Sequence, residues 1–122
     1  MFDQNASSPF FDPQWMFDVK EGFDIVIGNP PYGLFNKKQN KGESITVDPH
    51  VLKFYKDAPE YAPAKGGMLN IFRLFIVKSI RLLCKNGAFC EIFPLAYTCD
   101  VSAANTRKFV FDQCQIIRLE AF

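Results

Sequence analysis

Residues 29–32 read Asn-Pro-Pro-Tyr and have the side chains and backbone to hold an amino group. Two prolines fix φ at successive positions and remove two N–H donors, so the turn is stiff and rich in acceptors. The side-chain oxygen of Asn29 and the carbonyl of Pro30 can accept both hydrogens of one primary amine, which leaves its nitrogen lone pair free to attack an electrophile. Tyr32 offers a flat face for a planar base. Asn-Pro is also an ordinary turn signal, so a purely structural turn is the alternative.

A buried strand is expected immediately before this turn. Residues 23–27 read Phe-Asp-Ile-Val-Ile, and their β-branched content predicts a strand that Gly28 ends. The nearly continuous apolar character is typical of a parallel strand covered on both faces. In open parallel sheets, ligands bind beyond the carboxyl ends of the strands, and residues 29–32 fall at such an end.

Residues 68–84 form the clearest predicted helix, because apolar side chains recur every three or four positions. The positions that define this buried face are Leu69, Phe72, Ile76, Ile80 and Leu83. Asn70 is a candidate cap at the start, and Gly87 suits the left-handed position that follows a helix.

The rest of the chain continues this alternation of helices and strands. A strand is predicted over 88–93, a helix over 102–113 and a third strand over 116–119. Sequences that alternate strands and helices fold as α/β proteins with parallel strands and crossover connections. The predicted fold class is therefore α/β, in the order strand, helix, strand, helix, strand, with a mainly parallel sheet.

Composition limits the possible functions. The chain has 122 residues and a net charge of +1, so it forms one domain at most and has no global field that attracts nucleic acid. Four cysteines without C-x-x-C spacing and one histidine predict no metal site. The N-terminus lacks the features of a secretory signal, and no apolar run is long enough to cross a membrane. We therefore expect a cytoplasmic protein.

The segment DIVIGNPPYG, residues 24–33, resembles the catalytic motif of amino-methyltransferases that use S-adenosylmethionine, in particular the adenine-specific DNA methyltransferases. The lead-in FFDPQWMFDVKEGFDIVIGNPPY resembles that of the combined restriction-and-modification enzymes of bacteria. The later segments LNIFRLFIVKSIRLLCKNGAFCEIFP and AYTCDVSAANTRKFVFDQCQIIRLEAF resemble the helices and strands of the same family. The resemblance thus covers nearly the whole chain and implies a bacterial cytoplasmic enzyme of a restriction-modification system.

The resemblance implies a role for each residue of the turn. Asn29 and the carbonyl of Pro30 would hold the N6 amine of adenine, Pro31 would stiffen the turn, and Tyr32 would stack on the base. The base would be flipped out of the duplex, because its target atom is inaccessible inside it. S-adenosylmethionine would donate the methyl group.

The resemblance also implies how the chain divides. Residues 1–22 would be a lead-in, and residues 23–122 would be the C-terminal half of a Rossmann-like methyltransferase domain. Within it, 36–66 would form a long polar connection with mobility at its start. Three lysines of this connection are candidate contacts to DNA phosphates, with a solvated loop as the alternative. They are Lys37, Lys38 and Lys41.

The chain departs from the family pattern before the turn. The family's cofactor motif is a Gly-rich turn upstream of the catalytic motif, but only 28 residues precede Asn29, and Gly22 is their one glycine before Gly28. No Gly-x-Gly occurs. We therefore expect a fragment of a methyltransferase that binds S-adenosylmethionine poorly and gives no detectable methylation by itself. An uncovered sheet edge or apolar face would favour self-association.

Three alternatives remain open from the sequence. Protein-glutamine methyltransferases and RNA guanine-N2 methyltransferases use a similar Asn-Pro-Pro-Tyr turn on other amines. A non-catalytic fragment that binds only DNA or a partner chain is the third.

Overall fold

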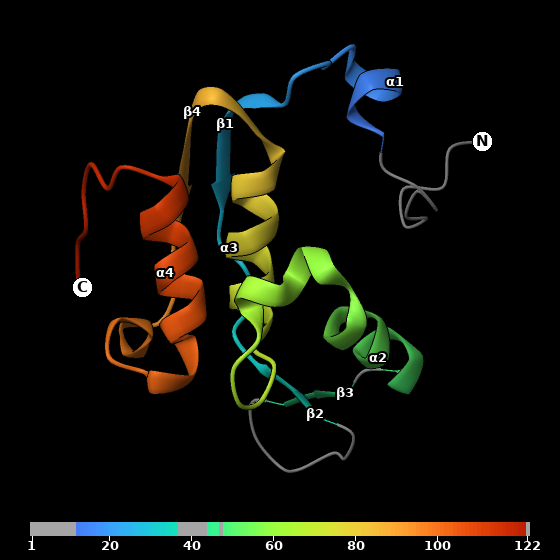
Figure 1. Cartoon of the computed structure of the whole chain (residues 1–122), viewed down its shortest axis with the longest axis vertical. Helices are drawn as coiled ribbons and strands as arrows, with labels where there is room; N and C mark the ends of the chain where they lie inside the picture. The colour runs from blue at the N-terminus through green and yellow to red at the C-terminus, as the bar shows by residue number, and fades with distance from the viewer. Residues whose placement is uncertain (1–11, 37–43, 47, 122) are drawn as a thin grey trace.

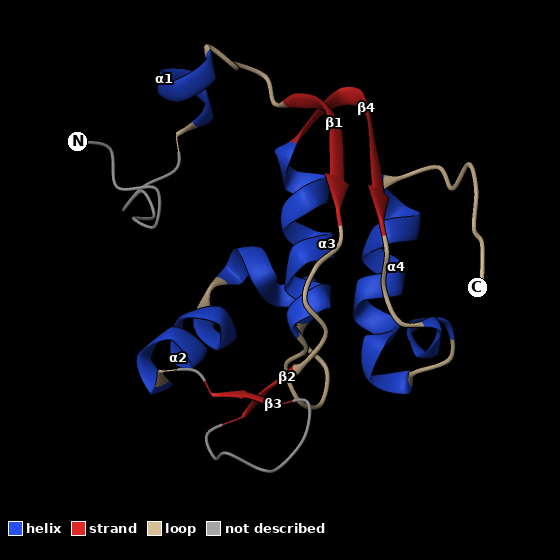
Figure 2. Cartoon of the chain, turned by 180° about the vertical axis from the view of Figure 1, so that it is seen from behind, coloured by secondary structure: helices blue, strands red, loops and turns tan. Residues whose placement is uncertain are grey.

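The computed structural model describes residues 12–36, 44–46 and 48–121. Its centre is a parallel pair of strands, β1 (Phe23–Gly28) and β4 (Leu83–Glu91), connected through the helix α3 (Ile71–Leu82). Figures 1 and 2 show α3 and α4 (Ala104–Gln113) on one side of this pair. The α/β class and the parallel pairing predicted from the sequence are confirmed.

The register of the two strands determines which side chains face α3. Val26 lies opposite Phe89, and Gly28 lies opposite Glu91. Glu91 hydrogen-bonds to Ser79 of α3, so these alternate positions face the helix, while the positions between them face away. The end of β1 is therefore fixed between β4 and α3.

The junction between α3 and β4 differs from the prediction. The helix ends at Leu82 and the chain enters β4 directly, and Asn86 rather than Gly87 takes the left-handed conformation, with φ of 67°. Pairing shifts here, because Phe23 lies opposite Leu83 whereas Ile25 already lies opposite Ala88. Gly87 serves close packing instead, since a Cβ atom there would lie 2.9 Å from the Phe23 carbonyl oxygen.

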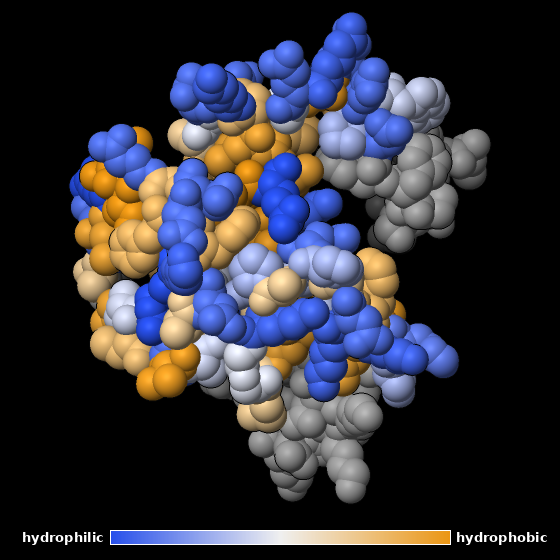
Figure 3. All heavy atoms as spheres, viewed as in Figure 1, coloured by the Kyte–Doolittle hydropathy of each residue, from blue (hydrophilic) through white to orange (hydrophobic). Residues whose placement is uncertain are grey.

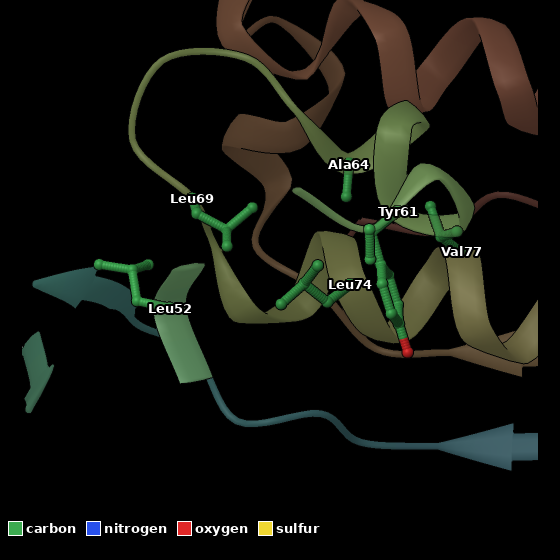
Figure 4. Close-up of a cluster of buried hydrophobic side chains, with 7 residues drawn as sticks. Leu52, Tyr61, Ala64, Leu69, Leu74 and Val77 are labelled. Carbon is green, nitrogen blue, oxygen red and sulfur yellow. The ribbon is translucent and has the colours of Figure 1, made fainter. Parts of the chain in front are cut away.

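The segment 36–66 contains much of the hydrophobic core. The helix α2 (Pro49–Asp57) and the 3-10 helix η1 (Pro59–Ala64) pack against α3. Figure 4 shows side chains of these elements gathered at the junction. The buried members of this cluster are Leu52, Ala58, Tyr61, Ala64, Leu69, Leu74 and Val77. The expected mobility at the start of this segment concerns residues that lie largely outside the described ranges.

Smaller elements complete the structure. The helix α1 is Pro13–Phe17, and the short parallel strands β2 and β3 are Leu34–Asn36 and Ser44–Thr46. The 3-10 helices η2 and η3 are Leu95–Thr98 and Val101–Ala103. They connect β4 to α4 and enclose a second cluster formed by Phe72, Ile76, Tyr97 and Ala103.

The third strand predicted over 116–119 is absent from the described structure. Ile116, Ile117 and Leu119 are exposed and belong to no strand. Strand geometry is held by hydrogen bonds to a neighbouring strand, and no described segment pairs with these residues. Their β-branched composition alone is therefore insufficient to form a strand.

The buried guanidinium of Arg73 joins three segments of the chain. Arg73 is 1% exposed and donates hydrogen bonds to the carbonyl oxygens of Gly66, Met68 and Ser102. These contacts attach α3 to the loop before it and to η3. Arg73 does not belong to the apolar pattern that predicts this helix, yet it is among the most deeply buried residues of α3.

One face of the sheet has no cover in the described structure. The side chains that point away from α3 are Ile25, Ile27, Ala88, Cys90 and Ile92, which we call the open face. Figure 2 views the strands from this side, and no described element crosses them. Figure 3 shows the opposite, helix-bearing side, where hydrophilic side chains are abundant. The open face therefore consists of exposed side chains that are aliphatic except for Cys90.

Candidate functional site

The Asn29–Tyr32 turn lies at the carboxyl end of β1, as predicted. Pro30 is buried, whereas Asn29, Pro31 and Tyr32 are exposed. Burial of the proline ring anchors the turn in the protein, and its fixed φ limits the backbone motion of its neighbours. The structure thus presents the polar and aromatic side chains to solvent from a rigid base.

Backbone hydrogen bonds hold the turn at both ends. The Ile92 N–H donates to the Gly28 carbonyl at 3.2 Å, and the Ile71 N–H donates to the Gly33 carbonyl at 3.0 Å. Ile71 is the first residue of α3, so its amide is among the donors that a helix leaves unpaired at its N-terminus. One end of the turn is therefore attached to β4 and the other to α3.

Asn29 and Tyr32 are close enough to act on one ligand. The Tyr32 hydroxyl lies 3.5 Å from the Asn29 Oδ1 atom. The hydroxyl thus donates only a long hydrogen bond to Oδ1, and the second lone pair of this amide oxygen can accept from an incoming donor. Within the described residues, no donor reaches the Pro30 carbonyl oxygen. The turn therefore offers two acceptors beside an aromatic ring that is 48% exposed.

Glu91 lies beneath the turn and was not identified from the sequence. It is the last residue of β4 and faces Gly28 across the pair of strands. The Ser79 hydroxyl donates to its Oε1 atom, and burial raises the pKa of the carboxyl group while this hydrogen bond lowers it. A single acidic residue in the otherwise apolar run Ala88–Phe93 was the available signal.

The end of β4 carries a second buried polar group. Tyr97 of η2 is 7% exposed and packs edge-to-face against Phe72 and Phe93. Its hydroxyl has no hydrogen-bond partner within the described part of the chain, and burial raises the pKa of Tyr97 to about 12.

Asn70, predicted as a helix cap, occupies the cap position, but its side chain makes no capping hydrogen bond.

The described residues do not form a recognisable cofactor site. Phosphate and nucleotide cofactors in α/β sheets are commonly held by Gly-rich turns, and the sequence contains no Gly-x-Gly. The expectation that this chain binds S-adenosylmethionine poorly therefore stays a prediction. No group of three or more potential metal ligands occurs in the described ranges.

Two further predictions concern contacts to DNA and the absence of membrane spans. Lys37, Lys38 and Lys41 lie outside the described residues, so their proposed DNA contacts stay predictions. Among the described helices, none is long and apolar enough to span a membrane.

Comparison with known proteins gives a consistent set of relatives. The family model for the Eco57I restriction-modification methylase matches residues 2–122. A protein of Methanocaldococcus jannaschii, assigned as a type II restriction enzyme and methyltransferase, is 33% identical over 100 residues, which cover 82% of this chain and 7% of that protein. The type II methyltransferase M.TthHB8I of Thermus thermophilus is 31% identical over 83 residues, which cover 67% of this chain and 18% of that protein. The chain thus spans less than a fifth of the length of either relative.

Proposed function

The chain belongs to the Eco57I restriction-modification methylase family, and from this premise we propose that it carries the amine-binding half of a DNA methyltransferase active site. The observation that carries the proposal is the Asn29–Tyr32 turn, which exposes Asn29 and Tyr32 above a buried Pro30. The names of the relatives support methyl transfer within a restriction-modification system. They offer no support for the protein-glutamine or RNA alternatives.

The proposed ligand is an adenine base presented outside the duplex. Asn29 Oδ1 and the Pro30 carbonyl would accept the two hydrogens of its N6 amine, and Tyr32 would stack on the ring. Removing a base from the stack costs a few kcal/mol, and stacking on an aromatic side chain returns about 1–3 kcal/mol per base. Hydrogen bonds from the amine to both acceptors favour the geometry in which the lone pair of the N6 nitrogen can react.

The methyl donor proposed for the family reaction is S-adenosylmethionine, whose sulfonium supplies the methyl group. The catalytic turn is assigned to the target amine alone, and no described residue is assigned to the donor. DNA is the proposed partner, and Lys37, Lys38 and Lys41 are proposed phosphate contacts. A protein that methylates cellular DNA in a prokaryote would act in the cytoplasm.

Nuclear magnetic resonance with single-stranded DNA tests this proposal. We expect an oligonucleotide containing one adenine to shift the Asn29 side-chain amide and Tyr32 ring resonances. Tyr32→Phe keeps the stacking face and should retain binding, whereas Tyr32→Ala should lose about 1–3 kcal/mol of it. Equal binding by both variants, or shifts confined to other residues, would refute the assignment.

A further inference from the structure

The carboxyl group of Glu91 occupies the space beside the missing side chain of Gly28. A Cβ atom placed on Gly28 would lie 3.6 Å from both Cγ and Oε1 of Glu91, which is ordinary van der Waals contact. The Glu91 side chain therefore borders the position that a Gly28 side chain would take, on the face that α3 covers. Gly28 precedes Asn29, so Glu91 lies beneath the base of the candidate amine-binding turn.

The two carboxyl oxygens of Glu91 have different surroundings. Oε1 accepts the hydrogen bond from the Ser79 hydroxyl. Oε2 is inaccessible to solvent and has no hydrogen-bond partner within the described residues. A buried acceptor without a partner is costly, and a charged one is more costly than a neutral one. The neutral carboxyl group therefore fits this site better than the carboxylate.

We infer that Glu91 is a positioning residue, which sets the geometry of the Asn29–Tyr32 turn through Gly28 according to whether its carboxyl group is protonated. When neutral, the group remains packed between β1 and α3. When ionised, Oε2 needs solvation, and the side chain must move toward water and withdraw its support from Gly28. The proposed function supplies the purpose of the turn, but the mechanical link between Glu91 and Gly28 does not depend on it.

The backbone gives this movement a direct route to the turn. Ile92 follows Glu91 and donates its N–H to the Gly28 carbonyl. A displacement of Glu91 therefore acts on Gly28 through the pairing of the two strands and through the adjoining hydrogen bond. Neither contact involves the exposed atoms of Asn29 or Tyr32.

Other charged groups near Glu91 are few in the described structure. From η2, Tyr97 is within electrostatic reach, but its pKa of about 12 keeps it neutral in the acidic range. On α3, Arg73 is bound to carbonyl oxygens, Arg81 lies over the Phe109 ring, and Lys78 is exposed. On β1, Asp24 contacts Cys84 near the other end of the strand. The main influences on the pKa of Glu91 are therefore burial, which raises it, and the hydrogen bond from Ser79, which lowers it.

The test is a pH titration of the labelled chain, with the backbone amides of Gly28 and Asn29 and the Glu91 carboxyl carbon observed together. We expect all three signals to share one midpoint above 4.5, the ordinary value for Glu. Glu91→Gln should abolish the amide titration. Ser79→Ala should raise the midpoint, because the hydroxyl that favours the carboxylate is lost. The matched control Glu60→Gln, at an exposed acid on η1, should change nothing at the turn.

Two results would overturn the inference. One is a Gly28 and Asn29 titration that persists unchanged in Glu91→Gln. The other is a Glu91 carboxyl signal in the unmodified chain that titrates without moving either amide, a result that needs no variant to fold. Loss of adenine recognition with an intact Glu91 titration would instead count against the proposed function alone.

Discussion

Asn29, Pro30 and Tyr32 differ in exposure in the way that a binding turn requires. Pro30 is buried and fixes the backbone, while the two side chains that would meet a ligand face solvent. No carboxylate or histidine is needed for the proposed role, because the residues act by accepting hydrogen bonds and by stacking. In the proposed role, the turn would act as a preorganised acceptor rather than as an acid or a base.

The buried hydroxyl group of Tyr97 gives a prediction about the stability of the fold and its pH dependence. Tyr97→Phe keeps the aromatic packing and removes a buried hydroxyl without a partner, so stability near neutral pH should be unchanged or rise by about 1 kcal/mol. In the unmodified protein, the folded state holds the phenolic proton up to a pKa of about 12, whereas the unfolded chain loses it near 10.0. Stability should therefore fall as the pH rises through this window.

Denaturant unfolding of both proteins across that pH range measures the difference. Tyr97→Phe should lack the part of the alkaline loss that belongs to this phenol. Parallel pH curves for the two proteins would contradict the burial of the hydroxyl.

The turn can be recognised from its residue types alone, whereas the residues beneath it can be identified only from the structure. Asn29 to Tyr32 are adjacent, so their joint role is visible in the sequence. Glu91 lies opposite Gly28 through strand register and meets Ser79 through helix packing, and both depend on contacts between distant segments. An acidic residue inside an apolar strand marked Glu91 as unusual without identifying its neighbours.

At the scale of elements, α3 organises the site. Its first amide holds Gly33, its first turn carries Arg73, and its last third supplies Ser79. The helix therefore contacts the turn, the preceding loop and the support beneath Gly28.

Arg73 provides the test at this scale. Arg73→Met keeps much of the buried volume but leaves three carbonyl oxygens without their donor, so we predict a loss of roughly 3 kcal/mol or more in unfolding free energy. Arg73→Lys should recover little, because one ammonium cannot reproduce the planar fork of the guanidinium.

The control is Arg81→Lys on the exposed side of α3, which should cost less than about 0.5 kcal/mol. Chemical denaturation of the three variants gives the comparison. Full recovery by Arg73→Lys would show that charge rather than geometry joins the segments.

Periodicity predicted α3 and β1 well because both carry strong local patterns. It failed at residues 116–119 because a strand also needs a neighbour, and local sequence does not supply one. It placed the left-handed residue at Gly87 instead of Asn86, since the irregular entry into β4 depends on pairing with β1. The helices within 36–66 gained their stability from packing on α3, which a polar composition conceals.

At the scale of the whole molecule, the open face leaves large apolar side chains exposed on the described part of the sheet. Ile25 is 67% and Ile27 is 78% exposed, although parallel sheets are normally covered on both faces. We propose that the isolated chain self-associates through this face, and we predict a mass above that of one chain in light scattering.

Ile27→Thr should reduce this association, because it replaces an apolar side chain at the centre of the face by a polar one of similar shape. Val101→Thr, at an exposed position on η3, is the matched control and should have no effect. A monomer at high concentration, or equal effects of both substitutions, would contradict the role of the open face.

The absence of a Gly-rich turn gives a second prediction for the whole chain. Calorimetry should detect no binding of S-adenosylmethionine, and labelled donor should transfer no methyl group to adenine-containing DNA. An oligonucleotide whose adenine N6 atom already carries two blocking groups cannot accept a methyl group there, and it gives the background for the transfer assay. Measurable transfer above that background would show that this chain holds a cofactor site of another kind.

The most direct test of the central claim compares two bases in two proteins. Oligonucleotides that contain either adenine or purine, which lacks the exocyclic amine, are titrated into the unmodified chain and into Asn29→Ala, and the ratio of dissociation constants is measured. We predict about thirtyfold tighter binding of adenine by the unmodified chain, equivalent to about 1 kcal/mol for each of two hydrogen bonds to the amine. In Asn29→Ala the preference should fall to about fivefold, because the Pro30 carbonyl remains as an acceptor. The same ratio in both proteins, or no preference in the unmodified chain, would contradict recognition of the amine by Asn29.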